Sequence, residues 1–208
     1  MTEVMEKPLT AQRAHTQERL MAAAVRVFAE RGIIGASVEE ICEAAGFTRG
    51  AFYSNFADKD ALVLALIRKN VRTQVAAAEQ AVARTLSATR RLDTADLVSF
   101  VLTAFVEFGT EDRETILIDR ELLLYAARQP ALRGPYLAFV AECDRQLSTL
   151  ISDALAHAGL EFTVPFEDGL TLLKATWEYE QLTTLFGADS KWAQMHTLLM
   201  AITRPVGA

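Results

Sequence analysis

The chain has 208 residues, of which 51% are hydrophobic and 23% are charged. This composition is ordinary for a soluble globular protein, and it excludes a chain that is disordered over most of its length. The two cysteines and three histidines are scattered without metal-ligand spacing, so we expect no metal site, no cofactor and no disulfide framework.

The net charge of −6 is not spread evenly along the chain. Residues 1–70 carry nine basic and nine acidic side chains, so the acidic excess lies entirely in residues 71–208. Because the local face decides whether a surface attracts phosphates, the overall acidity leaves DNA binding by the N-terminal part open. No apolar stretch has the length of a signal peptide or a membrane span, and we expect a cytoplasmic protein with no membrane partner.

The N-terminal residues predict a short arm and then two helices. Residues 1–16 are expected to form a flexible arm, and the apolar spacing over 17–31 predicts a helix with one buried face. Ser37 and Glu40 have the spacing of a capping box, in which each side chain bonds a backbone N–H at the start of a helix. That second helix ends at Gly46, which can adopt the positive φ of a tight turn.

A short third helix and a long fourth helix follow. Thr48 is the expected N-cap of the third helix, and Phe52 lies on its inner side. Asp58 opens the fourth helix. Residues 17–57 are therefore predicted to form a helix-turn-helix domain, which the helix over 58–85 connects to the rest of the chain.

The remaining sequence alternates helical patterns with Gly and Pro breaks. Five further helices are predicted, at 93–108, 111–128, 131–158, 166–187 and 190–203. No strand of alternating residues bounded by hairpin turns occurs in the pattern. We therefore predict an all-α protein of about nine helices.

The outer side of the third helix carries side chains that suit DNA. The guanidinium of Arg49, at the start of this helix, matches the O6 and N7 acceptors of guanine, and Gly50 beside it lets the backbone approach the groove. Hydroxyl, amide and ammonium groups near the helix starts suit phosphate contacts. The predicted DNA-binding residues are Ser37, Thr48, Arg49, Gly50, Tyr53, Ser54, Asn55 and Lys59. A helical hairpin whose polar side is merely solvated fits the same spacing.

Four segments lie in a dense run between Leu20 and Leu66: Ala-Glu-Arg-Gly, Ser-Val-Glu-Glu-Ile, Ala-Ala-Gly-Phe-Thr-Arg-Gly-Ala-Phe-Tyr-Ser-Asn-Phe and Asp-Lys-Asp-Ala-Leu. Together they resemble the N-terminal domain of the tetracycline-repressor (TetR) family of transcription regulators. The resemblance implies a homodimer that binds double-stranded DNA through its first three helices, with residues 58–208 forming an effector-binding and dimerisation domain. The run departs from the family pattern at Cys42, where Ala is common, and at Asn55, where His is common.

The last two predicted helices carry more apolar surface than a terminal pair usually exposes. The helix over 166–187 is apolar on two sides, and both sides need to be buried. We predict a two-fold, four-helix dimer interface, which suits a palindromic operator. The predicted interface residues are Leu170, Leu173, Trp177, Thr184, Trp192, Met195 and Leu199. Burial in the core of a single chain is the alternative.

Apolar side chains with a few polar groups predict a site for a small, apolar effector in the second domain. The candidates are Phe105, Phe108, Glu121, Leu124, Tyr125, Phe139, Cys143, Trp177 and Gln181. Each of them also fits an ordinary core. Glu121 is the most informative, because a carboxylate on a helix that is apolar nearly all round needs a partner: an Arg such as Arg120 or Arg128, or a ligand.

Two other functions remain open from the sequence. A regulator that ignores small molecules, or an activator that works through a protein partner, fits the same domains. An enzyme on a helical scaffold is the remote alternative, since Cys143 has no recognisable His and Asp setting and the sequence has neither HExxH nor a Gly-rich phosphate loop. We therefore expect a repressor that is not an enzyme.

Overall fold

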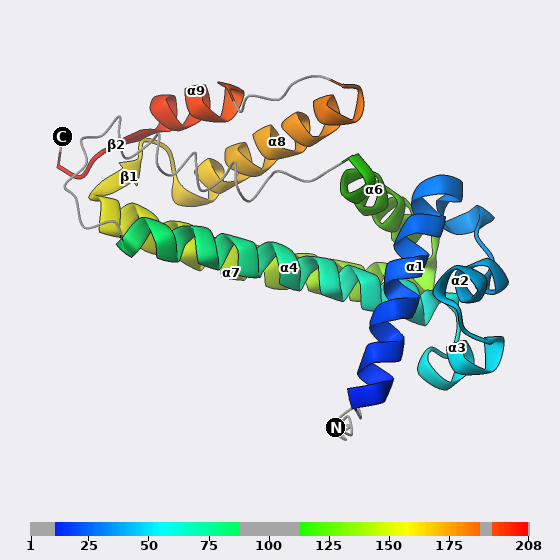
Figure 1. Cartoon of the computed structure of the whole chain (residues 1–208). Coiled ribbons are helices and arrows are strands. Elements are labelled where there is room, and N and C mark those ends of the chain that lie inside the picture. The colour runs from blue at the N-terminus through cyan, green and yellow to red at the C-terminus, as the bar shows by residue number, and fades with distance from the viewer. Residues whose placement is uncertain (1–10, 88–112, 188–192, 208) are drawn as a thin grey trace. The chain divides into compact units, whose positions relative to one another are not determined.

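The computed structural model describes residues 11–87, 113–187 and 193–207, and these form helices with one small pair of strands (Figure 1). The helices are α1 (Ala11–Gly35), α2 (Val38–Ala45), α3 (Arg49–Asn55), α4 (Lys59–Ser87), α6 (Arg113–Arg128), α7 (Pro130–Ala158), α8 (Phe166–Leu185) and α9 (Ala193–Ile202). The strands are β1 (Leu160–Phe162) and β2 (Thr203–Pro205). The predicted all-α class is confirmed. The helix predicted at 93–108 lies outside the described residues.

The chain divides into two compact units. Unit 1 comprises Met1–Arg68 and Ile118–Tyr136, and unit 2 comprises Lys69–Leu117 and Leu137–Ala208. Unit 1 thus joins the predicted helix-turn-helix domain to the first part of α4, most of α6 and the start of α7.

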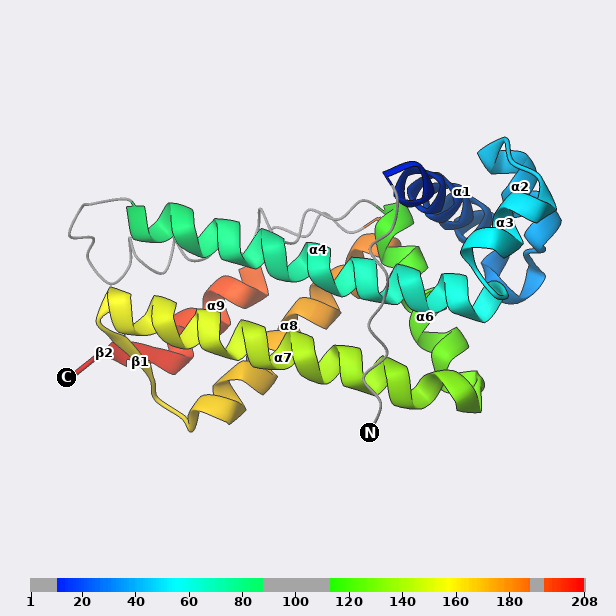
Figure 2. The same ribbon diagram turned by 90° about the horizontal axis from the view of Figure 1, so that it is seen from below.

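The core of unit 1 is formed by the apolar faces of its first three helices. Leu20 and Phe28 of α1, Ile41 of α2 and Phe52 of α3 are fully buried. Figure 2 shows α2 and α3 next to one another, beside α1. Burial of each such side chain stabilises the domain by about 1.5–3 kcal/mol, so the sequence positions of these apolar residues fix how α3 is presented.

Helix α1 differs from the prediction at both ends. It begins at Ala11, within the segment 1–16 that we expected to form an arm. Gly32 has φ 69°, as expected of a residue that ends a helix, but the chain continues beyond this kink for one more helical turn to Gly35. The Ala36 N–H donates to the Gly32 carbonyl oxygen at 3.2 Å and closes that turn.

Unit 2 contains two strands that the sequence did not predict. Strand β1 pairs antiparallel with β2, with Glu161 opposite Arg204, and the two chain segments lie beside the α8–α9 pair (Figure 1). Each strand has three residues and finds its partner about 40 residues away, so neither leaves an alternating pattern of useful length. The strands and the two helices share one apolar core, formed by Leu160, Phe162, Leu173, Met195, Leu199 and Ile202.

This core corrects the predicted dimer interface. Leu170, Leu173, Met195 and Leu199 are buried within the chain itself and offer no surface to a partner. Trp177 is half-buried and packs against the same core. The Thr184 hydroxyl donates to the Glu180 carbonyl oxygen of its own helix at 3.0 Å, and Trp192 lies outside the described residues.

Candidate nucleic-acid interface

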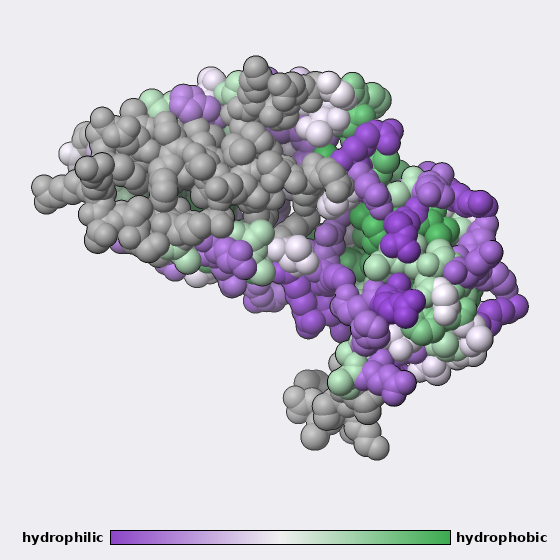
Figure 3. Space-filling view, viewed as in Figure 1, coloured by the Kyte–Doolittle hydropathy of each residue, from purple (hydrophilic) through white to green (hydrophobic). Residues whose placement is uncertain are grey.

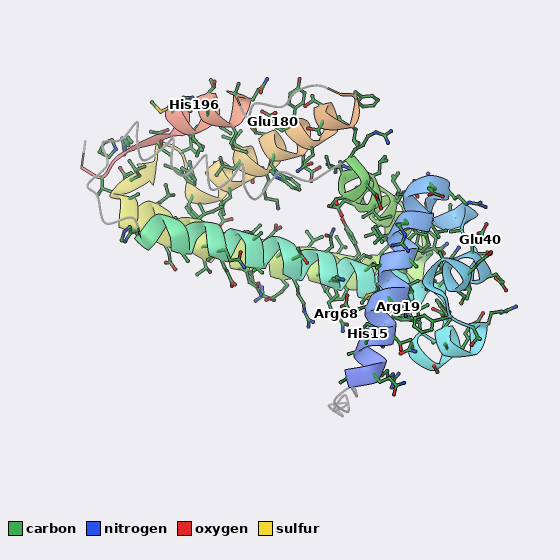
Figure 4. The ribbon with its side chains drawn as sticks, viewed as in Figure 1. His15, Arg19, Glu40, Arg68, Glu180 and His196 are labelled. Atoms are coloured by element: carbon green, nitrogen blue, oxygen red, sulfur yellow. The ribbon has the colours of Figure 1, made fainter. Side chains whose placement is uncertain are left out.

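Helix α2 begins at the predicted capping box. The Ser37 Oγ accepts a hydrogen bond from the Glu40 N–H at 3.2 Å, and the Glu40 Oε2 accepts one from the Ser37 N–H at 2.8 Å. The Ser37 N–H is the largest cause that lowers the pKa of the Glu40 carboxyl, and the ion pair with Arg31 of α1 contributes too. Figure 4 labels Glu40 on this helix. The start of α2 is thereby fixed to the end of α1.

A side chain of α1 holds the turn between α2 and α3. Gly46 has the predicted left-handed conformation, with φ 70°, and its N–H donates to the Glu43 carbonyl oxygen at 3.1 Å. The Arg19 Nη2 donates to the Ala45 carbonyl oxygen at 2.8 Å, and its guanidinium lies 4.7 Å from the centre of the Phe47 ring. Figure 4 labels Arg19 on α1. Sequence reasoning missed this residue, because nothing in the spacing of α1 indicates which turn its polar side meets.

Helix α3 presents a polar outer face. Thr48 caps its start by accepting a hydrogen bond from the Ala51 N–H at 3.2 Å. The Arg49 Nη1 lies 2.6 Å from the Glu39 Oε1 of α2, and the guanidinium lies 5.8 Å from the centre of the Tyr53 ring. A hydrogen bond with Tyr53, followed by the charge of Glu39, raises the pKa of Arg49, which stays a cation. The exposed residues of this face are Thr48, Arg49, Gly50, Tyr53 and Ser54.

Ser54 and Asn55 bond the backbone of their own helix. The Ser54 Oγ and the Asn55 Nδ2 both donate to the Ala51 carbonyl oxygen, at 2.9 Å and 2.8 Å. Asn55 is half-buried, and the Gln17 Nε2 donates to the main-chain carbonyl oxygen of Asn55 at 3.4 Å. The end of α3 is therefore tied to α1, and Ser54 is the more accessible of the two predicted DNA contacts.

Lys59, predicted to contact phosphate, joins the end of α1 to the start of α4. Its Nζ donates to the carbonyl oxygens of Ile33 and Ala36, at 2.7 Å and 2.9 Å, and lies 5.9 Å from the centre of the Tyr125 ring. Two of the three N–H donors of the ammonium are used in this way. In the structure Lys59 thus satisfies carbonyl groups at the end of α1, and its contact with phosphate through the third donor stays a prediction.

Two predicted pocket residues of α6 bond the end of α1 and the start of α4 within unit 1. The Glu121 Oε2 accepts a hydrogen bond from the Ile33 N–H at 3.2 Å, beside the kink at Gly32. Its partner is thus a backbone N–H, where we expected an Arg or a ligand. The Tyr125 hydroxyl donates to the Asp60 Oδ1 at 2.7 Å, and burial, followed by this hydrogen bond, raises the pKa of Tyr125 to about 12.

The other pocket candidates are divided along the chain. Leu124 is exposed in unit 1, and Phe105 and Phe108 lie outside the described residues. The candidates in unit 2 are Phe139, Cys143, Trp177 and Gln181. Gln181 is 3% exposed, and its Nε2 has no hydrogen-bond partner in the part of the chain that the structure describes.

Cys143 is buried, and its environment disfavours a nucleophilic role. Burial, followed by the charge of Asp144, raises the pKa of the Cys143 thiol to about 11. Since the thiolate is the reactive form, this thiol is poorly suited to covalent catalysis at neutral pH. Within residues 11–87, 113–187 and 193–207, no three His, Cys, Asp or Glu side chains form a group that could hold a metal ion.

The same described residues include no helix that is both long enough and apolar enough to cross a membrane. Figure 3 shows hydrophilic and hydrophobic side chains interspersed around α1 and α2 in this view.

Two capped helices, a glycine turn and an exposed, cation-bearing second helix define a helix-turn-helix domain. Residues 20–66 match the model of the family described as "Bacterial regulatory proteins, tetR family". An HTH-type transcriptional repressor of Mycobacterium tuberculosis is 38% identical over 80 residues, which are 38% of this chain and 41% of that protein. The chain spans less than half the length of the curated relatives that it matches first.

Solved structures are similar over almost the whole chain. A TetR-family transcriptional regulator from Mesorhizobium loti aligns with a TM-score of 0.71 at 17% identity, over 93% of this chain and 99% of that chain. The multidrug binding protein EbrR, solved with imidazole, aligns with a TM-score of 0.58 at 24% identity, over 99% of each chain. At these identities the likeness concerns the fold. The match over residues 20–66 identifies these residues as the N-terminal domain of the tetR family of bacterial regulatory proteins, and the rest of the chain resembles TetR-family regulators in fold.

Proposed function

We propose that this protein is a transcriptional repressor that binds a palindromic operator as a homodimer and leaves it when a small, apolar effector binds. The observation that carries the proposal is the outer face of α3, where an exposed Arg49 stands at the helix start between a carboxylate and an aromatic ring. A helix presented in this way enters the major groove with its first residues at the base edges.

The proposed DNA contacts follow from what each side chain offers. Arg49 donates to guanine, and Gly50 adds no side chain that would keep the backbone away from the groove. Thr48, Tyr53 and Ser54 supply hydroxyls, and Ser37 lies at the start of α2, where backbone N–H groups favour phosphate. Asn55 makes a smaller contribution to DNA binding than the other residues, since its amide is bonded to its own helix.

For the dimer, we propose the side of α8 opposite the core. Leu172, Tyr179 and Leu182 are exposed along one face of this helix, Phe186 beside its end is 84% exposed, and Met200 of α9 is also exposed. Large apolar side chains grouped in this way favour contact with another protein surface. The partner that suits a palindromic operator is a second copy of the same chain. The two-fold axis that relates the two subunits then also relates the two half-sites of the operator.

For the effector, we propose a site in unit 2 that includes Gln181. A buried amide N–H without a partner costs about 1–3 kcal/mol, and a ligand oxygen that accepts its hydrogen bond would recover that cost. EbrR, a protein of the same fold, is described as a multidrug binding protein, which supports a small-molecule ligand here. Because effector binding and DNA binding are reciprocally linked, a ligand that favours another position of α4 weakens DNA binding.

Binding to DNA is tested with a library of fluorescently labelled duplexes titrated at several salt concentrations. The Arg49→Ala variant should lose about 1–3 kcal/mol of operator binding and discriminate less between sequences. Arg145→Ala, which removes an exposed Arg from α7, is the control and should bind as the parent does. An Arg49→Ala variant with unchanged sequence preference would refute the assignment of α3.

The dimer is tested by sedimentation. Phe186→Glu should shift the protein to monomers and weaken operator binding, whereas Leu137→Glu, at a residue of α7 that is 64% exposed, should leave the dimer intact. A Phe186→Glu protein that sediments as a dimer would rule out this face. Effectors are sought by thermal shift, since a ligand at 100 times its dissociation constant stabilises the folded state by about 2.7 kcal/mol.

A further inference from the structure

The ion pair between Glu39 and Arg49 joins the two helices of the helix-turn-helix on their outer side. The Glu39 Oε1 lies 2.6 Å from the Arg49 Nη1, and the side chains retain 54% and 61% of their exposure. Glu39 stands in the first turn of α2 and Arg49 is the first residue of α3. The pair therefore lies on the surface that the proposed function presents to DNA.

An exposed pair of this kind contributes little to folding. Surface ion pairs typically add little to stability, because water screens the charges and two long side chains lose rotamer freedom. The helices are already held together by the buried Ile41 and Phe52 and by Arg19 at the turn. The stability of the fold therefore does not explain why Glu39 carries a carboxylate.

A carboxylate on a DNA-binding face also has an electrostatic cost. Each negative charge there repels the phosphates that supply most of the sequence-independent attraction. The same carboxylate contacts the Arg49 guanidinium, which ends a long side chain with many rotamers. The carboxylate engages one nitrogen, and the ring of Tyr53 lies 5.8 Å from the guanidinium carbon. With five N–H donors, Arg49 still has others to offer a base.

We propose that Glu39 is a positioning residue for DNA recognition, which holds the Arg49 guanidinium in one orientation for a single base pair and so exchanges overall affinity for sequence discrimination. This inference rests on the proposed function, since it concerns how the same face reads DNA. It predicts opposite changes when the carboxylate is removed: binding to unrelated DNA becomes tighter, while the preference for one base pair becomes weaker.

The matched control is Glu43, which lies one turn further along α2 and is exposed. Glu39→Gln and Glu43→Gln each remove one negative charge from the same side of this helix. Both should tighten binding to unrelated DNA by a similar, few-fold factor at low salt. Only Glu39→Gln should change discrimination.

The experiment begins with the full-length protein and a randomised duplex library, from which the preferred sequence is selected. Dissociation constants are then measured for that sequence and for each single base-pair change. Arg49→Ala should flatten the preference at one base pair in each half-site, and Glu39→Gln should lower the preference at the same base pair by about tenfold. In the Arg49→Ala background, Glu39→Gln should cause no further loss, because the residue acts through the guanidinium.

Glu39→Asp provides a second variant that retains the charge and shortens the side chain. It should lose part of the discrimination without the gain in binding to unrelated DNA. Circular dichroism and the melting temperature should be unchanged in every Glu39 variant. If Glu39→Gln keeps the full preference and only binds all DNA more tightly, as Glu43→Gln does, Glu39 is a competing charge and the inference is wrong. If the parent protein selects no sequence at all, the proposed function itself fails.

Discussion

Replacing Gly50 by Ala separates the folding of α3 from its fit to DNA. A Cβ added at Gly50 would meet only the Thr48 Oγ1, at 3.7 Å, which is an ordinary van der Waals distance. Ala is the better helix former by about 0.5–1 kcal/mol in a helix interior. Since Gly50 is the second residue of α3, we take the lower value, and the variant should melt about 1–2 °C higher than the parent.

The same methyl group should weaken operator binding. If the backbone at Gly50 lies against the groove, the added Cβ occupies space between the helix and the bases. The helix then has to move away from the bases, which lengthens its contacts with them. The loss should be comparable to that of one mismatched base pair, about 1–3 kcal/mol, or roughly 5- to 150-fold in the dissociation constant. Fluorescence anisotropy with labelled operator DNA measures this change, and thermal unfolding of the same preparation measures stability.

Ser152→Ala is the control for this experiment, because it introduces a better helix former at an exposed position of α7. It should give a small rise in melting temperature with no change in DNA binding. A Gly50→Ala protein that is more stable and binds the operator within twofold of the parent would show that this residue does not lie against DNA. The orientation that we assign to α3 would then be incorrect.

Three further predictions concern the other parts of the chain. Gly169→Ala should destabilise the protein by about 1–3 kcal/mol in urea unfolding, because its Cβ would lie 2.4 Å from the Phe162 ring; an unchanged midpoint would contradict this packing. Tyr125→Phe should remove a stabilising hydrogen bond at neutral pH. Because the folded protein raises the pKa of Tyr125 to about 12, against about 10 in the unfolded chain, the advantage of the parent is present below pH 10. It should decline as the pH rises from about 10 towards 12, which urea unfolding at several pH values can follow. Finally, iodoacetamide should label Cys143 slowly at pH 8 in the native protein and rapidly in urea, because burial raises the pKa of this thiol to about 11; equal rates would show that the site is open.

Local signals in the sequence predicted the helix-turn-helix well. The capping box at Ser37, the cap at Thr48 and the positive φ of Gly46 involve residues three or four positions apart. Such short-range bonds depend on residue type and spacing, which a sequence displays directly. The inner position of Phe52 followed from helical periodicity for the same reason. Once the cap and the buried side of α3 were predicted, the residues left over were those of its outer face.

Contacts between distant segments were the part that the sequence could not supply. Glu39 meets Arg49 across the turn, while the partners of Lys59 lie 26 and 23 residues earlier. Glu121 and Ile33 are 88 residues apart. An exposed Lys near a helix start has the same local pattern whether it meets a phosphate or a carbonyl group. The two apolar sides of α8 posed the same problem, since periodicity identifies two faces without saying which one the chain itself covers.

The long-range contacts change what α6 is expected to do. Glu121 and Tyr125 fit a ligand pocket by residue type, yet within unit 1 they bond Ile33 at the end of α1 and Asp60 at the start of α4. Lys59 adds bonds between the same two helix ends. A displacement of α6 would therefore stretch hydrogen bonds at both ends of the segment that carries α2 and α3. The two helix ends that flank α2 and α3 are both bonded to α6. Under the proposed function, an effector can therefore alter DNA binding through α6 without touching α3.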